Sequence, residues 1–271
     1  DDLIVSNAGD HLFLVVNASM RDQDIPHMKA YLPDIEVTEI FDRALIAVQG
    51  PSAQDVVARH CPQAAELSFM QTCEALISGT LCRISRLGYT GEDGFEISVA
   101  AEDGPGLADL LLGYDSVRWI GLGARDSLRL EAGLCLYGHD MDVTTSPVEA
   151  GILWSISKSR RVGGAKEGGF LGAEAIFAQI ANGVAKKRVG FLVDGRAPVR
   201  EGAEIVDASG AVVGAITSGG FGPTLQAPIA MGYVPTELAA VGTQLNALVR
   251  GVARPITVAK MPLLEQRYYR G

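Results

Sequence analysis

The first residues that could do chemistry lie in a glycine-rich stretch, Gly88–Glu96, which reads GYTGEDGFE. Three glycines within seven residues allow a backbone to turn tightly or to approach a ligand closely. In the strand expected next, Glu96 points away from the face shared by Phe95, Ile97 and Val99, because successive side chains alternate. The carboxylate could be solvated on a hairpin, which the spacing alone favours. It could also accept two parallel hydrogen bonds from a ligand such as a 2-amino-4-oxopyrimidine.

A second candidate site follows in residues 121–131, which read GLGARDSLRLE. A helix predicted over 124–136 places Arg125 and Arg129 four residues apart on one face. The simplest interpretation is a pair of surface arginines. The functional one is a fork for a carboxylate or phosphate tail, which the planar guanidinium suits better than a lysine. The preceding G-x-G lacks the third glycine of a dinucleotide-binding fingerprint.

Three further segments carry weaker signals. The chain opens with two adjacent acids, Asp1 and Asp2, and acids at a chain end are usually just solvated. Residues 139–142 read HDMD, which could suggest a metal but are better explained as a loop with a hydrogen-bonded His139. Residues 217–223 read TSGGFGP, and we interpret them as a glycine-rich turn between strands.

Composition excludes several classes of function. The chain has 271 residues and a formal net charge of −9, which disfavours non-specific binding to nucleic acid. No run of about 18 apolar residues is present, so we expect no membrane-spanning helix. The four cysteines form no C-x-x-C pair and no histidine falls at a ligand spacing beside them, so we expect no metal site. Sparse cysteines favour a compartment where thiols stay reduced.

The elements that must position these residues show two kinds of sequence pattern. Around residues 44–120 the pattern predicts a compact α+β unit of three strands and two helices; the strands are expected over 44–48, 81–87 and 95–99. From Lys186 onward, short β-branched runs alternate with Gly, Asp, Ser and Pro turns. Short strands at 8–12-residue spacing predict a small barrel or sandwich.

Several of these segments together resemble the aminomethyltransferase (T-protein) family of the glycine cleavage system. The similarity runs in order along essentially the whole chain. It is carried by Gly88–Glu96, Gly121–Glu131, Leu136–Met141 (LYGHDM), Ala211–Pro223, Met231–Pro235 (MGYVP) and Lys260–Pro262 (KMP).

The resemblance implies an α+β fold, a three-domain cloverleaf around a central folate site. It assigns residues 1–43 and 141–185 to a discontinuous folate-binding domain, 44–140 to a ferredoxin-like domain and 186–271 to a C-terminal β-barrel. The family's chains normally begin well before the DDLIV segment. We therefore expect an N-terminally incomplete member, with part of the first domain missing.

The implied activity is a tetrahydrofolate-dependent aminomethyl transfer of glycine cleavage, without a metal. The family releases ammonia from an aminomethyl group on the lipoyl arm of the H-protein and forms 5,10-methylene-tetrahydrofolate. By resemblance, Asp2 is the catalytic carboxylate and Glu96 accepts hydrogen bonds from the pterin. Arg125 matches a folate-binding arginine, and Tyr268 matches a folate contact near the C-terminus. Tyr89 is a further candidate for a folate contact.

Two alternatives stay open beside this interpretation. One is a related folate-dependent demethylase module, of the kind that accompanies a flavin domain. The other is a non-catalytic, folate-binding regulatory protein of the same fold, which should lose the acid and the GYTGEDG run that this chain keeps. The expected partners are lipoylated H-protein and tetrahydrofolate, with no nucleic acid and no membrane. We expect a cytoplasmic location, or the mitochondrial matrix if the source is eukaryotic.

Overall fold

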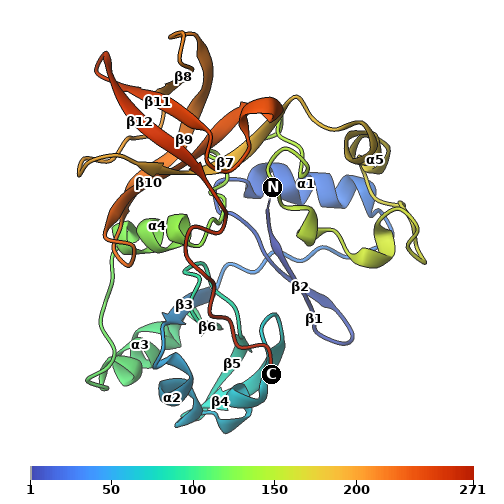
Figure 1. Ribbon diagram of the computed structural model, residues 1–271. Coiled ribbons are helices and arrows are strands. Elements are labelled where there is room, and N and C mark those ends of the chain that lie inside the picture. The colour runs from blue at the N-terminus through green and yellow to red at the C-terminus, as the bar shows by residue number, and fades with distance from the viewer. Residues whose placement is uncertain (1) are drawn as a thin grey trace. The chain divides into compact units, whose positions relative to one another are not determined.

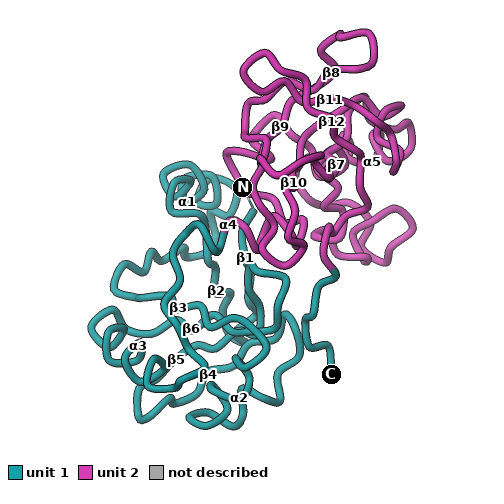
Figure 2. The backbone as a smooth tube through the Cα atoms, turned by 60° about the vertical axis from the view of Figure 1, so that its left-hand side comes forward, with its two compact units in different colours: residues 1–125, 265–271 teal, residues 126–264 magenta. Residues whose placement is uncertain are grey.

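A computed structural model describes residues 2–271, so Asp1 of the opening acid pair lies outside the described residues. The chain divides into two compact units, coloured separately in Figure 2. The first unit runs to Arg125 and takes in the last residues, Glu265–Gly271; the second is Asp126–Leu264. Each unit has its own hydrophobic core and is described by itself below.

The first unit begins with a two-stranded antiparallel hairpin, β1 (Ile4–Asn7) and β2 (Leu12–Val15), in which Ile4 pairs with Val15 (Figure 1). Helix α1 (Arg21–Tyr31) follows. Along β1, Val5 is 52% exposed whereas Ile4 and Ser6 are half-buried. The alternation of a pleated strand therefore gives the hairpin one covered face and one exposed face.

The rest of the first unit is a four-stranded antiparallel sheet in the order β3-β6-β5-β4. Its strands are β3 (Arg43–Gln49), β4 (Thr72–Ile77), β5 (Thr80–Ser85) and β6 (Gly94–Ala100). The helices are α2 (Ala53–Ala58), η1 (Pro62–Glu66), η2 (Ala101–Asp103) and α3 (Gly104–Leu112). The predicted strand set omitted β4, because Glu74 and Ala75 in its middle are poor strand formers.

The core of this sheet confirms the face predicted for β6. Phe95, Ile97 and Val99 each expose 0% of their surface and belong to one apolar cluster with residues of α2 and α3. Burying this cluster is the dominant favourable term in folding the sheet and its helices together. Glu96 lies on the opposite face of a strand that is paired on both edges, with Ala47 of β3 and Ser85 of β5.

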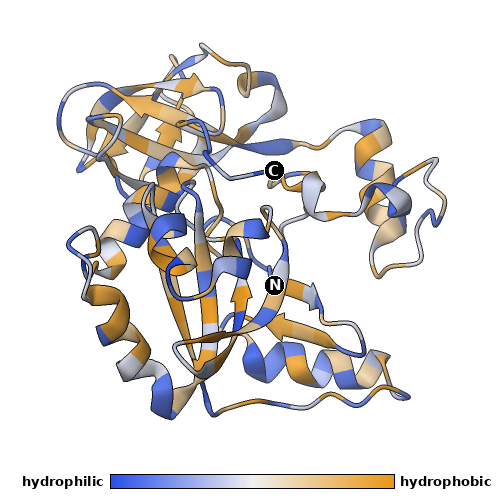
Figure 3. Cartoon of the chain, turned by 90° about the horizontal axis from the view of Figure 1, so that it is seen from below, coloured by the Kyte–Doolittle hydropathy of each residue, from blue (hydrophilic) through white to orange (hydrophobic). Residues whose placement is uncertain are grey.

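The second unit contains a closed six-stranded barrel in the order β10-β7-β12-β11-β8-β9, which confirms the predicted C-terminal barrel. Its strands are β7 (Lys186–Val193), β8 (Glu204–Val206), β9 (Val212–Gly222), β10 (Ala227–Pro235), β11 (Gln244–Val249) and β12 (Val252–Ala259). The short helix η5 (Thr236–Leu238) follows β10. The barrel strands and the four-stranded sheet carry long hydrophobic stretches, drawn orange in Figure 3.

The glycine-rich turn predicted over 217–223 is wrong, because most of it lies inside β9. Its glycines permit close packing of the backbone. A Cβ on Gly219 would collide with the carbonyl oxygen of Val199, and one on Gly232 of the neighbouring strand would collide with that of Ala215. Glycine inside a strand often marks such a close approach.

Helix α4 (Leu122–Glu131) contains the boundary between the two units, after Arg125. It ends before the predicted limit at residue 136 because Gly133 takes the left-handed conformation, with a φ of 69°. The helices η3 (Leu153–Ser155), η4 (Lys158–Arg160) and α5 (Ala173–Asn182) follow, and Gly183 ends α5 with a φ of 82°. Among residues 2–271, no helix is both long and apolar enough to cross a bilayer.

Candidate functional site

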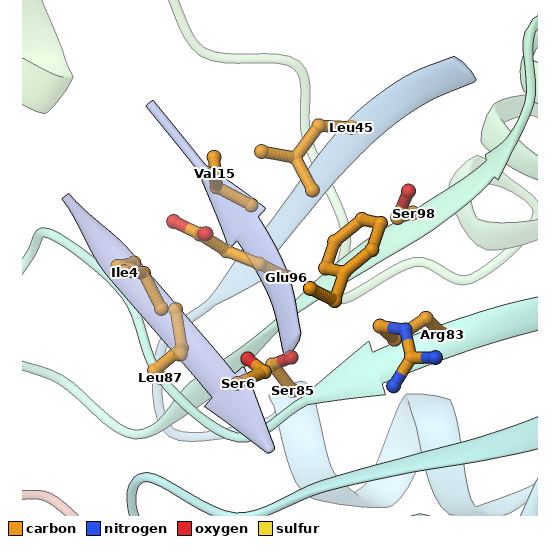
Figure 4. Close-up of a pocket in the computed structure, with 10 residues that line it drawn as sticks. Ile4, Ser6, Val15, Leu45, Arg83, Ser85, Leu87, Glu96 and Ser98 are labelled. Atoms are coloured by element: carbon orange, nitrogen blue, oxygen red, sulfur yellow. The ribbon is translucent and has the colours of Figure 1, made fainter. Parts of the chain in front are cut away.

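A pocket in the first unit lies between the β1–β2 hairpin and the exposed face of the four-stranded sheet (Figure 4). Its apolar wall includes Ile4 and Val15 of the hairpin and Leu45 of β3. The polar groups that line it are Ser6, Arg83, Ser85, Glu96 and Ser98. The cavity between these side chains has a volume of about 10 Å³, which is room for about one water molecule, so a larger ligand requires its walls to move apart.

Glu96 is the acidic group of this pocket. It exposes only 9% of its surface, so the interpretation of a solvated hairpin carboxylate is wrong. Burial raises the pKa of Glu96, and the positive charge of Arg125 partly offsets this effect. Within residues 2–271, no group donates a hydrogen bond to its carboxylate. The pocket therefore holds a largely buried carboxylate that receives no hydrogen bond from the described chain.

Arg125 and Tyr89 lie together in the first unit, and both were predicted as site residues. The guanidinium carbon of Arg125 is 4.4 Å from the centroid of the Tyr89 ring, a cation–π contact. The charge of Arg125 also acts on Glu96. The Arg125 guanidinium thus interacts with two other predicted residues, with Tyr89 by a ring contact and with Glu96 by its charge.

Arg129 is buried, so the simplest interpretation, a pair of surface arginines, is wrong for this residue, and the alternative of a fork with Arg125 is not supported either. Its side chain is 3% exposed in the second unit and pairs with Asp140 at 2.7 Å and with Asp126 at 2.7 Å. It also donates to Ser218 Oγ at 2.8 Å. A buried guanidinium needs such partners to offset its desolvation, which leaves no donor directed to a ligand tail.

Asp2 lies just before the hairpin and is held by Asn17. The Asn17 side-chain amide donates to Asp2 Oδ1 at 2.8 Å and to the Asp2 carbonyl oxygen at 3.2 Å. Asp2 keeps a solvent-facing surface, but the protein atoms packed around it desolvate the carboxylate and raise its pKa; the hydrogen bond from Asn17 acts in the opposite direction. Sequence reasoning missed Asn17, because nothing local connects it to Asp2.

Tyr268 is placed by a stacking contact in the first unit. Its ring lies parallel to that of Phe69, with centroids 4.0 Å apart and planes 7° apart. The backbone N–H of Phe69 donates to the Tyr269 carbonyl at 2.7 Å. Burial raises the pKa of Tyr268, and Arg270 opposes the shift. Phe69 is a second residue that the sequence did not identify.

The C-terminal residues also contact the glycine-rich loop 88–94. The backbone N–H of Arg267 donates to the Gly91 carbonyl at 2.8 Å, and its guanidinium pairs with Glu92 at 2.9 Å. The loop that carries Tyr89 and the tail that carries Tyr268 are therefore joined directly.

The glycines of the loop serve the fold of the chain itself. The sequence alone did not distinguish this role from a close approach to a ligand. Gly91 requires its positive φ of 76°, which favours glycine. A Cβ on Gly88 would overlap the Gln49 side chain, and one on Gly94 would collide with the Val48 carbonyl. Gln49 donates to the Leu87 carbonyl at 3.0 Å. The close approach at Gly88 and Gly94 is thus to the chain itself.

The HDMD segment is structural. The His139 ring lies 2.7 Å from Glu201 and its side chain is 44% exposed, whereas Asp140 and Met141 are buried. Across the described part of the chain, no group of three or more His, Cys, Asp or Glu side chains is arranged to hold a metal ion.

Comparison with known proteins gives two family matches along the chain. The GCVT N-terminal domain matches residues 1–160, and the glycine cleavage T-protein C-terminal barrel domain matches residues 186–265. The second match begins at Lys186, where β7 begins.

Similarity over the whole of this chain supports the same assignment. The mitochondrial aminomethyltransferase of Pisum sativum is 44% identical over 100% of this chain and 67% of its own length. The probable mitochondrial aminomethyltransferase of Schizosaccharomyces pombe is 43% identical over 100% of this chain and 70% of its own length. The chain spans about two thirds of the length of these relatives.

A solved structure shows the same fold. The glycine cleavage system aminomethyltransferase T from Bartonella henselae superimposes with a TM-score of 0.88 at 40% identity, covering 99% of this chain and 73% of that one. The barrel, the mixed α/β architecture and the family matches agree throughout. The chain belongs to the glycine cleavage T-protein family of aminomethyltransferases.

Proposed function

We propose that this chain acts as a tetrahydrofolate-dependent aminomethyltransferase of glycine cleavage and that the pocket beside Glu96 binds the pterin. The observation that carries the proposal is the buried Glu96 carboxylate, which no described hydrogen-bond donor satisfies. A buried polar group without a partner costs free energy unless a ligand supplies one. The amino-pyrimidinone edge of a pterin offers two parallel N–H donors, which match a carboxylate.

Three other predicted residues of the first unit suit the remainder of the folate molecule. Arg125 presents a guanidinium beside Tyr89, and guanidinium is the preferred partner of carboxylates such as those of the glutamyl tail. Tyr268 and Tyr89 supply aromatic surface for the apolar part of the ligand. These four residues are the proposed folate-binding set.

Asp2 is the proposed catalytic carboxylate. If the strand pattern of β1 continues back by two residues, Asp2 shares the face of Ile4 and Ser6, both of which line the pocket. Its raised pKa makes it a better proton acceptor than an ordinary aspartate near neutral pH. Its charge would also stabilise positive charge on the transferred carbon. Tetrahydrofolate, when bound, supplies the nucleophilic nitrogen that receives the one-carbon unit.

The proposed partner is the lipoylated H-protein, whose aminomethyl group is the one-carbon source and whose ammonia is released. No metal is required by this proposal. The named relatives above are mitochondrial proteins. For this chain, none of the four cysteines forms a disulfide within residues 2–271, which suits a thiol-reducing compartment such as the cytoplasm of a bacterium or the mitochondrial matrix.

The proposal is tested by titration calorimetry of the protein with tetrahydrofolate, comparing wild type with Glu96→Gln. The substitution replaces one acceptor by a donor, and we expect a loss of about 1.5–3 kcal/mol of binding free energy, the range for a hydrogen bond to a charged group. Glu102→Gln is the matched control, because Glu102 is exposed in the same unit. An unchanged dissociation constant for Glu96→Gln would remove Glu96 from the folate site.

A further inference from the structure

Arg86 is a fully buried arginine in the first unit, just after β5, with 0% of its surface exposed. All five of its N–H donors are accepted. Nε and Nη2 donate to the two carboxylate oxygens of Asp93 at 3.0 and 2.5 Å. Nη1 donates to the carbonyl oxygens of Leu67 at 2.8 Å and Ala65 at 3.2 Å, and Nη2 also donates to Gln54 Oε1 at 2.5 Å.

The flat faces of the same guanidinium contact aromatic rings. Its carbon lies 4.0 Å from the centroid of Tyr269 and 5.2 Å from that of Phe95. Phe95 is the neighbour of Glu96 on β6, whereas Tyr269 is the neighbour of Tyr268 in the tail. Asp93 belongs to the loop 88–94. One buried side chain therefore touches the loop, the strand and the tail.

The segment 67–71, against which the tail packs, is also held by Arg86. The Arg86 backbone N–H donates to the Gln71 carbonyl, and the Met70 N–H donates to the Arg86 carbonyl, both at 2.9 Å. Phe69, between these contacts, stacks on Tyr268 and donates to the Tyr269 carbonyl. The surface that receives the tail is thus fixed by the main chain and the side chain of one residue.

We propose that Arg86 is a positioning residue of the site: it fixes the loop 88–94 and the C-terminal tail against each other, so that Tyr89 and Tyr268 present a preformed surface to the folate. The inference rests on the proposed function of this pocket. A buried guanidinium leaves costly unpaired groups if any partner moves away. The loop and the segment under the tail are therefore constrained together, and a site held in this way loses less ordering entropy on binding.

Tyr269→Leu is the sharpest test, because it removes the ring over Arg86 while all five hydrogen bonds of the guanidinium remain. Tyr269 is 43% exposed, so leucine fits without repacking a core. We expect tetrahydrofolate to bind up to about tenfold more weakly, because loss of a cation–π contact worth about that factor lets the tail leave its docked position. The thermal unfolding midpoint should fall by no more than about a few degrees. Tyr269→Phe keeps the ring and should bind like wild type.

Limited trypsin digestion supplies a readout that does not depend on folate. The tail contains two cleavage sites, Arg267 and Arg270, and mass spectrometry follows release of the terminal peptides. Tyr269→Leu and Arg86→Lys should both release them faster than wild type and Tyr269→Phe, because lysine keeps the charge but cannot reproduce the five-donor fork.

The outcomes separate this inference from the proposed function. If wild type does not bind tetrahydrofolate, the proposed function fails, whereas the digestion still shows whether Arg86 fixes the tail. If Tyr269→Leu binds folate as tightly as wild type, or releases its tail no faster, the positioning role of Arg86 is overturned. The role is supported if Tyr269→Leu releases its tail faster and binds folate more weakly than wild type, whereas Tyr269→Phe behaves like wild type in both measurements.

Discussion

Asn17 donates its side-chain amide to the Asp2 carboxylate at 2.8 Å, and this contact lies two residues beyond the Ile4–Val15 pair that ends the β1–β2 hairpin. The register of the hairpin thus brings together two side chains that lie just before β1 and just after β2. The proposed catalytic acid is fixed by a neighbour that is distant in sequence. A positioned carboxylate of this kind is what proton transfer in an active site requires.

Removal of the Asp2 charge should affect turnover far more than folate binding. Asp2→Asn keeps the shape and the oxygen that accepts from Asn17, and we expect turnover to fall by about 10²–10⁴-fold, the usual contribution of a positioned acid–base group. Folate affinity should change less than in Glu96→Gln, because the charge acts mainly in the transition state. The measurement is methylene-tetrahydrofolate formation from aminomethylated H-protein. Asp10→Asn, at the exposed hairpin turn, is the control; equal loss in both variants would contradict the assignment.

Loss of the Asn17 amide should move the acid limb of the pH–rate profile. The hydrogen bond favours the charged form of Asp2 and lowers its pKa, so Asn17→Ala should raise that pKa further. Because Asp2 must be ionised to accept a proton, turnover should begin to fall at a higher pH than in wild type. Asn7→Ala, whose side chain caps the Gly9 N–H in the same hairpin, should leave the limb in place. A limb that does not move in Asn17→Ala would show that another group controls it.

The ligand-free protein should be more stable without the Glu96 charge. The folded-state pKa of Glu96 is raised, so the stability associated with its protonated form is present at low pH and is lost as the pH rises through that pKa. Glu96→Gln should therefore unfold at a higher temperature than wild type at pH 7. The difference should shrink as the pH is lowered. Calorimetric scans across this range test the sign, and a lower midpoint for the variant at pH 7 would show that Arg125 outweighs desolvation.

Asp140 should be a stability determinant of the second unit. Its carboxylate accepts from Arg129 at 2.7 Å, Ser218 at 2.9 Å and the Leu136 N–H at 2.9 Å, with 0% of the residue exposed. Asp140→Asn removes the buried one of the two carboxylates that pair with the Arg129 guanidinium and leaves only the half-exposed Asp126, and we expect a loss of about 3–5 kcal/mol in urea unfolding. Glu201→Gln is the control. The Glu201 side chain is 55% exposed and pairs with His139, so this change should cost less than about 1 kcal/mol.

The sequence by itself determined which face of β6 would be buried. In β6 the alternation of Phe95, Ile97 and Val99 with Glu96 predicts the core face, because the pleat has a period of two residues. The β-branched runs after Lys186 likewise predict a small barrel or sandwich, and the closure of the six strands into a barrel is seen only in the structure.

Only the tertiary structure decided how the charged groups are used. Whether Glu96 is solvated depends on the β1–β2 hairpin that lines the other side of its pocket, and whether Arg129 can reach a ligand depends on Asp140 and Ser218. These neighbours come from distant parts of the chain, and their proximity follows from the packing of whole elements. Because desolvation and pairing set the energy of a charge, its role could not be read from spacing alone.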